Sequence, residues 1–111
     1  MDLQISDPLF AEKLKARTAL SDVIDPELGV NIVDLGLVYG VDFPEGDKVL
    51  VNMTLSTPHC PLGEAIEEGV VNALEAVFPA CTIAINLVWD PVWNFDMISE
   101  AGREQLGLSL G

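Results

Sequence analysis

The most regular part of this sequence is residues 61–79, PLGEAIEEGVVNALEAVFP. Its apolar residues recur at steps of three and four, and polar residues fill the opposite side, which is typical of an amphipathic helix packed on a core. Pro61 suits the first turn of this helix, and Pro79 ends it. The apolar stripe consists of Leu62, Ala65, Ile66, Gly69, Val70, Ala73, Leu74 and Val77.

Strand patterns lie on both sides of this helix. Leu35–Phe43 and Val49–Leu55 are β-prone and are separated by the turn cluster Pro44–Asp47, which predicts an antiparallel hairpin. Thr82–Trp89 predicts a third strand. Because the helix returns the chain over the sheet, we expect the third strand to run parallel to the second through a right-handed crossover.

A helix is predicted at each end of the chain. Asp7 and Pro8 suit an N-cap and a first helical position, and the first helix should end near Asp22. A mostly apolar stripe along it is formed by Leu9, Phe10, Leu14, Arg17 and Leu20. The last helix is expected at about Asp96–Leu106, weakened by Gly102 in its interior.

The sequence therefore predicts an α+β fold in the order α-β-β-α-β-α. We expect a two-layer α/β sandwich in which the helices pack mainly on one face of a small three-stranded sheet. The length of 111 residues fits one domain spanning 1–111. Fifty per cent of the residues are hydrophobic and the mean hydropathy is +0.37, so the chain can fill a core.

The net charge is strongly negative. The chain has 18 acidic residues against 5 Lys and Arg, which gives a charge of −13 and a pI near 4.1. Phosphate backbones and anionic lipid surfaces repel such a polyanion, so nucleic-acid and membrane partners are not expected. Between Val49 and Gly102 there are seven acidic residues and no Lys or Arg. A basic protein partner or a metal cation suits this charge better.

The sequence predicts a cytoplasmic protein. Its N-terminus lacks the basic and apolar regions of a secretory signal, and the longest uncharged run, Val49–Gly63, falls short of the ~20 apolar residues of a membrane helix. Cys60 and Cys81 should then be reduced thiols. The predicted helix separates them by about 27 Å, too far for a shared bond or metal. Cys81 is most simply a small buried apolar residue.

Three loops are expected to meet at one end of the sheet. They are Asp25–Asp34 before the first strand, Thr57–Cys60 after the second and Trp89–Trp93 after the third. Small domains often carry their function at such a loop cluster. The loops also have plainer interpretations, because Asp25-Pro26-Glu27 is a common turn starter and the two tryptophans can simply cover the end of the core.

Cys60 is the candidate metal-binding or nucleophilic thiol of these loops. The start of the following helix favours the thiolate form of Cys60, whereas Glu64 and the overall negative charge oppose it. A bound soft metal would supply the positive charge that stabilises the thiolate. His59 and Cys60 offer two ligands, with Asp25, Glu27 and Asp34 across the loops, and His59 could equally be a plain polar loop residue. The Cys-x-x-Cys spacing of structural zinc sites is absent.

Two chains together could supply enough ligands for a labile cluster or a metal, with Cys60 from each chain. This arrangement implies a homodimer. A cysteine hydrolase or transferase built on Cys60, His59 and Asp25 or Asp34 is a weaker interpretation, because the sequence supplies the residue types without a recognised geometry.

Five segments in this order and spacing resemble the iron–sulfur cluster assembly domain family, which includes PaaD-like and SufT-like proteins and the eukaryotic cytosolic iron–sulfur targeting factor. The resemblance covers the chain from about the first helix to Leu106. The segments are Asp25–Glu27, Asn31–Val38, Met53–Leu55, Thr57–Pro61 and Trp89–Trp93.

The resemblance implies an assembly or targeting factor for iron–sulfur cluster maturation, with no catalysed reaction of its own. It would handle iron or a transient iron–sulfur cluster and bind assembly or client proteins. The family's reactive cysteine falls on Cys60, its acidic loop on Asp25, Glu27 and Asp34, and its hydroxyl position on Thr57. His59 stands where the family often has Gly, and Ser56 where it often has Thr. The alternative is a protein–protein adapter that binds no metal.

Overall fold

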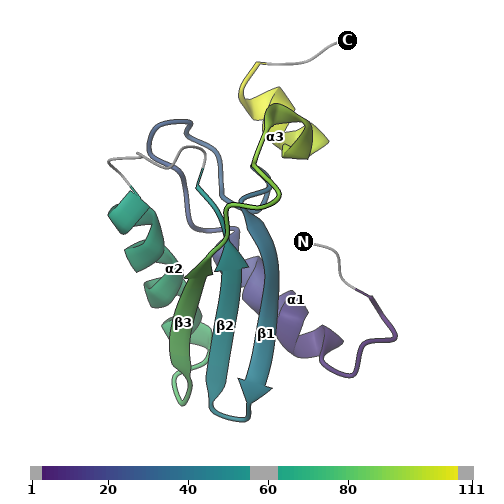
Figure 1. Cartoon of the computed structure of the whole chain (residues 1–111), viewed down its shortest axis with the longest axis vertical. Helices are drawn as coiled ribbons and strands as arrows, with labels where there is room; N and C mark the ends of the chain where they lie inside the picture. Colours follow the sequence, from purple (N-terminus) through teal and green to yellow (C-terminus); the bar gives the residue numbers. More distant parts are fainter. Residues whose placement is uncertain (1–3, 56–62, 108–111) are drawn as a thin grey trace.

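The structure is a computed structural model, and it describes residues 4–55 and 63–107. The expected order of helices and strands is confirmed, with a short 3-10 helix, η1, added before the last helix (Figure 1). The elements are α1 (Phe10–Leu20), β1 (Val38–Glu45), β2 (Lys48–Met53), α2 (Gly63–Val77), β3 (Thr82–Leu87), η1 (Phe95–Met97) and α3 (Glu100–Gln105).

The sheet has the predicted topology. Its strand order is β1-β2-β3, with β1 and β2 antiparallel and β2 and β3 parallel. α1 packs against α2 and β1, and α2 packs against β3, so the two long helices form the second layer. On the other face, Asn86 donates to Asn52 and Asn52 donates to Asp42, at 3.0 and 2.9 Å. This polar ladder across three strands marks the face that the helices leave open.

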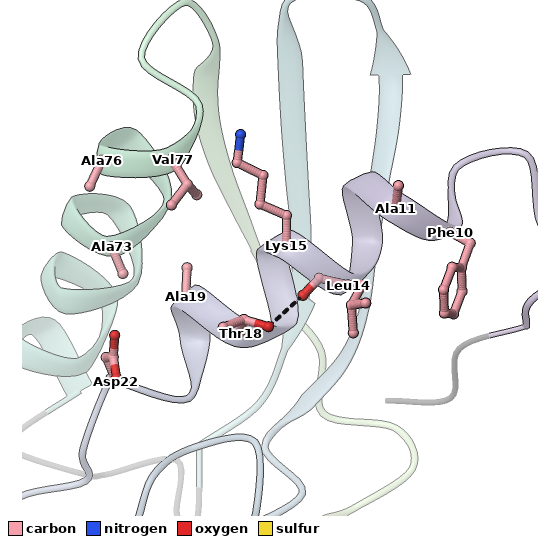
Figure 2. A pocket seen from close by; sticks show the side chains of 10 residues that line it. All are labelled: Phe10, Ala11, Leu14, Lys15, Thr18, Ala19, Asp22, Ala73, Ala76 and Val77. Atoms are coloured by element: carbon pink, nitrogen blue, oxygen red, sulfur yellow. Dashed lines mark hydrogen bonds between the residues drawn. The ribbon is translucent and has the colours of Figure 1, made fainter.

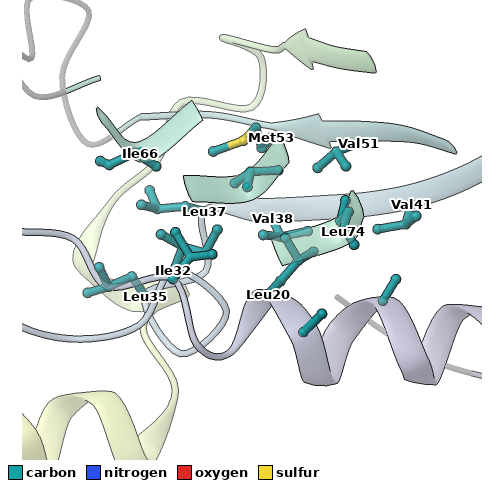
Figure 3. Packing of buried hydrophobic residues seen from close by; sticks show 14 of the residues in the cluster. Leu20, Ile32, Leu35, Leu37, Val38, Val41, Val51, Met53, Ile66 and Leu74 are labelled. Atoms are coloured by element: carbon teal, nitrogen blue, oxygen red, sulfur yellow. The ribbon is translucent and has the colours of Figure 1, made fainter. Parts of the chain in front are cut away.

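The core lies between the two layers (Figure 3). β2 alternates as a half-covered strand should: Val49, Val51 and Met53 are fully buried and point at the helices, while the residues between them are partly exposed. Leu20 of α1 and Leu74 of α2 meet them from the helical layer. Ile32, Leu35 and Leu37 extend the core under the loop that precedes β1.

The predicted apolar stripe of the first helix is confirmed at Leu20 and is wrong at Leu9 and Leu14. α1 buries Ala16, Ala19 and Leu20, whereas Leu9 and Leu14 are 37% and 40% exposed. Small alanines let α1 lie close to its neighbours, so the larger apolar residues are not the ones that face the core. Asp7 accepts a hydrogen bond from the Leu9 amide at 2.7 Å, but in a turn before the helix, which starts at Phe10.

Several predicted boundaries also shift. β1 starts at Val38, not Leu35, because the Leu37 amide donates to the Ile32 carbonyl and closes a turn. β2 and β3 end two residues early, at Met53 and Leu87. The predicted last helix is broken into η1 and α3, since Ser99 adopts an extended backbone and caps α3 by accepting from the Gly102 amide at 3.1 Å.

The second helix has its described start at Gly63, and it ends at Val77, two residues before Pro79, as expected for a proline that ends a helix. Pro61 lies outside the described residues. Cys81 is half-buried rather than buried, and it packs against the edge of the core. Within residues 4–55 and 63–107, no helix is long and apolar enough to cross a membrane.

Candidate functional site

The loop between α1 and β1, residues 21–37, carries Asp25, Glu27 and Asp34 and is called the acidic loop below. It is fixed to the end of β2 by a line of backbone hydrogen bonds. The Thr54 amide donates to Leu37, the Leu37 amide to Ile32, and the Ile32 amide to Val23, at 2.8, 3.0 and 2.9 Å. At the same end, Gly63 lies so close to Leu55 that an added Cβ would be 2.9 Å from Leu55 Cδ1. The end of β2, the start of α2 and the acidic loop therefore lie together.

The segment after β3 joins this cluster. Trp93 Nε1 donates to the Leu35 carbonyl at 2.6 Å, and the Tyr39 hydroxyl donates to the Pro91 carbonyl at 2.8 Å. The structure thus brings together two of the three predicted loops. The third loop, with Thr57, His59 and Cys60, lies outside the described residues.

Asp25 is the buried carboxylate of the cluster, with 1% of its surface exposed. Its Oδ1 accepts from the amides of Glu27 and Leu28 at 2.8 and 3.3 Å, as expected for an Asx turn. Its Oδ2 has no hydrogen-bond partner in the described parts of the chain. Glu27, by contrast, is exposed. A buried carboxylate oxygen without a partner is costly, so Asp25 is the acidic residue here that most needs an external donor or cation.

Asp34 has a different environment. Its Oδ1 accepts from the Ser99 hydroxyl at 2.9 Å, and its Oδ2 accepts from Asn31 Nδ2 at 2.7 Å. The Asp34 carbonyl also accepts from the Ser99 amide at 2.7 Å. Both carboxylate oxygens are therefore occupied, and Asp34 fastens the segment before α3 to the acidic loop.

Sequence reasoning did not single out Asn31 and Ser99, the two partners of Asp34. Ser99 carried a usable signal, because serine directly before Glu100 and Ala101 is a common N-cap pattern. Asn31 had a weaker one: an Asn three residues before an Asp in a loop can bond forward, and its Oδ1 accepts from the Asp34 amide at 2.9 Å.

The two tryptophans differ in burial. Trp93 packs against the core and meets Phe95 edge to face, with ring centroids 5.5 Å apart. Trp89 is 42% exposed. The plain interpretation that a tryptophan covers the end of the core therefore holds for Trp93 and not for Trp89.

The described residues do not form a metal site by themselves. In 4–55 and 63–107, no three His, Cys, Asp or Glu side chains are arranged to hold a metal ion. Any such site would need ligands from residues 56–62, which include His59 and Cys60, or from a second chain.

Tyr39 of β1 links the sheet to the segment after β3 through its hydroxyl group. Its pKa is raised above 10.0, chiefly because burial disfavours the phenolate and further because Asp90 is negative, with the Thr54 hydroxyl acting in the opposite direction. The phenol is therefore a neutral hydrogen-bond donor that holds Pro91 in place.

A hollow of about 650 Å³ lies elsewhere, between α1 and α2 (Figure 2). Phe10 and Leu14 line it from α1, and Ala73 and Val77 from α2. Lys15 stands at its rim, with Nζ 5.1 Å from the centre of the Phe78 ring. The predicted site residues that the structure describes, Asp25, Glu27 and Asp34, do not line this hollow.

Comparison with known proteins places the chain in a family. The sequence profile described as "Iron-sulfur cluster assembly protein" matches residues 13–85. The chain belongs to this iron–sulfur cluster assembly protein family. It is 43% identical over 88 residues to an Fe-S protein maturation auxiliary factor of Porphyromonas gingivalis, covering 79% of this chain and 84% of that protein. It is 41% identical over 87 residues to the Fe-S protein maturation auxiliary factor SufT of Staphylococcus aureus, covering 78% and 99%.

Solved structures of similar sequence share the fold. A domain of unknown function from Bacillus anthracis superimposes with a TM-score of 0.82 at 37% identity, covering 89% of this chain and 94% of that one. A conserved hypothetical protein from Thermotoga maritima gives 0.73 at 33% identity, covering 96% and 99%. The match to the iron–sulfur cluster assembly profile includes the acidic loop and Cys60 but ends before Trp93 and Ser99.

Proposed function

We propose that this chain is a cytoplasmic assembly or targeting factor for iron–sulfur proteins, which handles iron or a labile cluster as cargo through Cys60 and binds client or scaffold proteins. The observation that carries the proposal is the buried Asp25 carboxylate, whose Oδ2 has no partner in the described residues. It lies in the loop that is tied to the end of β2, and the segment with Cys60 follows β2 in the sequence.

Chain geometry supports a place for Cys60 in this cluster. Leu55 and Gly63, which flank residues 56–62, are in contact. Consecutive Cα atoms are 3.8 Å apart, so three peptide links keep the Cys60 Cα within about 11 Å of that of Gly63 whatever the path between them.

Charge favours a cationic cargo over a reactive thiolate. The 15-residue helix α2 directs the positive end of its dipole towards the residues before Gly63, which favours a thiolate there. Glu64 in its first turn opposes this, and residues 49–102 contain no Lys or Arg to offset it. A metal cation supplies the positive charge that the surroundings lack. The proposal accordingly includes no catalysed reaction.

The other candidate residues have unequal parts in the proposal. Asp25 and the exposed Glu27 stand beside the cargo, whereas Asp34 positions the loop through Asn31 and Ser99. Thr57 and His59 precede Cys60 in the sequence, by three positions and by one, and are assigned to the same site. With one Cys60 per chain, cluster binding requires ligands from a second copy or from the client.

Anaerobic reconstitution with iron and sulfide tests the proposal. Cys60→Ala should retain much less iron and sulfide than the wild type after desalting. Cys81→Ala is the matched control, because Cys81 is half-buried at the other end of α2 and should not affect retention. Equal retention by wild type and Cys60→Ala would remove Cys60 as a ligand.

An adapter that binds no metal is the second candidate function. The acidic residues of α2, which can dock a basic partner without any metal, favour it. If the chain is an adapter, the Cys60→Ala variant should support client maturation in cells as well as the wild type does. If the chain is a cargo carrier, this variant should lose that support. Salt should weaken client binding in both cases if the acidic surface makes the contact.

A further inference from the structure

The two edges of the sheet differ in how they are protected. The outer edge of β1 carries Asp42, Pro44 and Glu45, and its pairing with β2 is interrupted by two register shifts. Charges, proline and bulges are the features that keep edge strands from pairing with other chains. β3 has none of them: residues 81–89, CTIAINLVW, contain no charged residue, Pro or Gly.

The backbone of β3 offers a regular row of unpaired groups. The Thr82 amide donates to Asp47 and the Val88 amide to Met53, both at 2.8 Å, so even-numbered residues direct their polar groups towards β2. Because the direction alternates along a strand, Ile83, Ile85 and Leu87 direct their N–H and C=O groups outwards. β3 ends the sheet, and no described residue forms a strand beyond it.

The side chains at this edge suit an additional strand. Ile83, Ile85 and Leu87 lie on the helix-facing side of the sheet, in register with the buried Val49, Val51 and Met53. Unlike those β2 residues, they are only partly buried. An added strand with apolar residues at matching positions would cover them.

The charge around the edge selects the added strand. α2, which packs beside β3, presents Glu64, Glu67, Glu68 and Glu75 (Figure 1). The nearest basic residues along the chain are Lys48 and Arg103, so residues 49–102 contribute no positive charge. A second copy of this chain would bring another charge of −13 and another acidic α2 to the same edge. Salt screens charges only beyond a Debye length of about 8 Å, so two copies paired at this edge would still repel each other. This repulsion disfavours pairing between copies.

We propose that the outer edge of β3 binds an extended segment of a partner protein by strand addition, the segment having alternating apolar residues with Lys or Arg between them. Backbone hydrogen bonds to Ile83, Ile85 and Leu87 hold the segment. Its apolar residues cover these three side chains, so its Lys or Arg residues point to the open face of the sheet, where the chain's net charge of −13 attracts them. The inference rests on the docking part of the proposed function and specifies its surface. It does not involve Cys60.

Amide hydrogen exchange of the full chain tests the inference. The probe is a capped peptide, Thr-Lys-Val-Lys-Val-Lys-Val-Lys-Thr, and the control peptide has Glu in place of each Lys. With the lysine peptide at ten times its Kd, exchange of the Ile83, Ile85 and Leu87 amides should slow about tenfold. The glutamate peptide should leave those amides unchanged.

Two variants of one residue separate edge pairing from side-chain contact. Ile85→Pro removes an outward N–H and leaves the bonds between β2 and β3 in place, so it should abolish protection of Ile83 and Leu87. Ile85→Ala loses a similar amount of side chain but keeps the N–H, and protection should persist. Slow exchange of the inward Ala84 and Asn86 amides verifies that both variants are folded.

Three results would overturn the inference. They are an unprotected edge with the lysine peptide, equal protection by both peptides, and a free chain that sediments as a dimer with these amides already protected. The last result would assign the edge to a second copy. Peptide binding should be the same in Cys60→Ala, so failure of the cargo proposal would leave this test unaffected.

Discussion

Replacing Gly36 by alanine should destabilise the protein far more than the same change at Gly29. Both glycines lie in the acidic loop and have similar left-handed backbones, with φ of +76° and +71°. Their surroundings differ, because a Cβ at Gly29 would have nothing within 4 Å. A Cβ at Gly36 would collide with the Met97 carbonyl oxygen and lie 2.9 Å from its carbon.

The magnitudes follow from these contacts. A left-handed backbone costs an L-residue roughly 1–2 kcal/mol, which is the whole penalty expected for Gly29→Ala. Gly36→Ala adds a clash with backbone, which cannot rotate away as a side chain can, and overpacking of this kind costs about 1–3 kcal/mol more. Moving Met97 also strains the Trp93 Nε1 bond to Leu35, next to Gly36, worth about 1 kcal/mol. We expect a loss of about 3–6 kcal/mol in all.

Urea unfolding of the two variants and the wild type measures this difference. Far-UV circular dichroism follows the helices, and tryptophan fluorescence follows the environment of Trp93. Gly36→Ala should also shift the native fluorescence, whereas Gly29→Ala should not. Equal losses of unfolding free energy in the two variants would refute the packing of η1 against the acidic loop.

Two further predictions concern single titratable groups. Asp25→Asn keeps an oxygen for the Glu27 and Leu28 amides, so its unfolding free energy should stay within about 1 kcal/mol of wild type, whereas Asp25→Ala should lose about 1–3 kcal/mol. Iron retention should fall in both variants, and full retention by a folded Asp25→Asn would remove Asp25 from the cargo site. Tyr39, the chain's single tyrosine, should titrate above pH 10.0 by its phenolate absorbance, and Asp90→Asn should lower that midpoint. Because the folded state favours the neutral phenol, this group stabilises the fold below its unfolded pKa, and the contribution is lost as the pH rises through the raised value.

The order of elements was predictable because its signals are local. The 3.6-residue period of α2 and the alternation of β2 follow directly from which side faces the core. α1 shows the limit of this reasoning, because its burial depends on the small size of Ala16 and Ala19 rather than on a strong apolar stripe. The predicted start of β1 was wrong for a related reason. Leu35 and Leu37 are buried and apolar, as in a strand, but they belong to a turn.

The links that shape the candidate site are long-range, and no local pattern encodes them. Ser99 reaches Asp34 across 65 positions, and Trp93 reaches Leu35 across 58. The topology predicted that these loops would meet, since it fixes which strand ends lie at which edge. It could not predict which side chains would bond, because that depends on how the segment after β3 folds back over the acidic loop.

Asp25 and Asp34 have the same side chain and lie in the same loop, yet their surroundings divide their roles. Asp34 receives a hydrogen bond on each oxygen, and both donors are neutral groups of this chain. Asp25 has two amides on one oxygen and no described partner on the other, at 1% exposure. The described structure contains a single ion pair, between Lys13 and Asp7, so no basic side chain there compensates Asp25. A cation bound beside Asp25 would therefore gain more from its carboxylate than from any other in the loop.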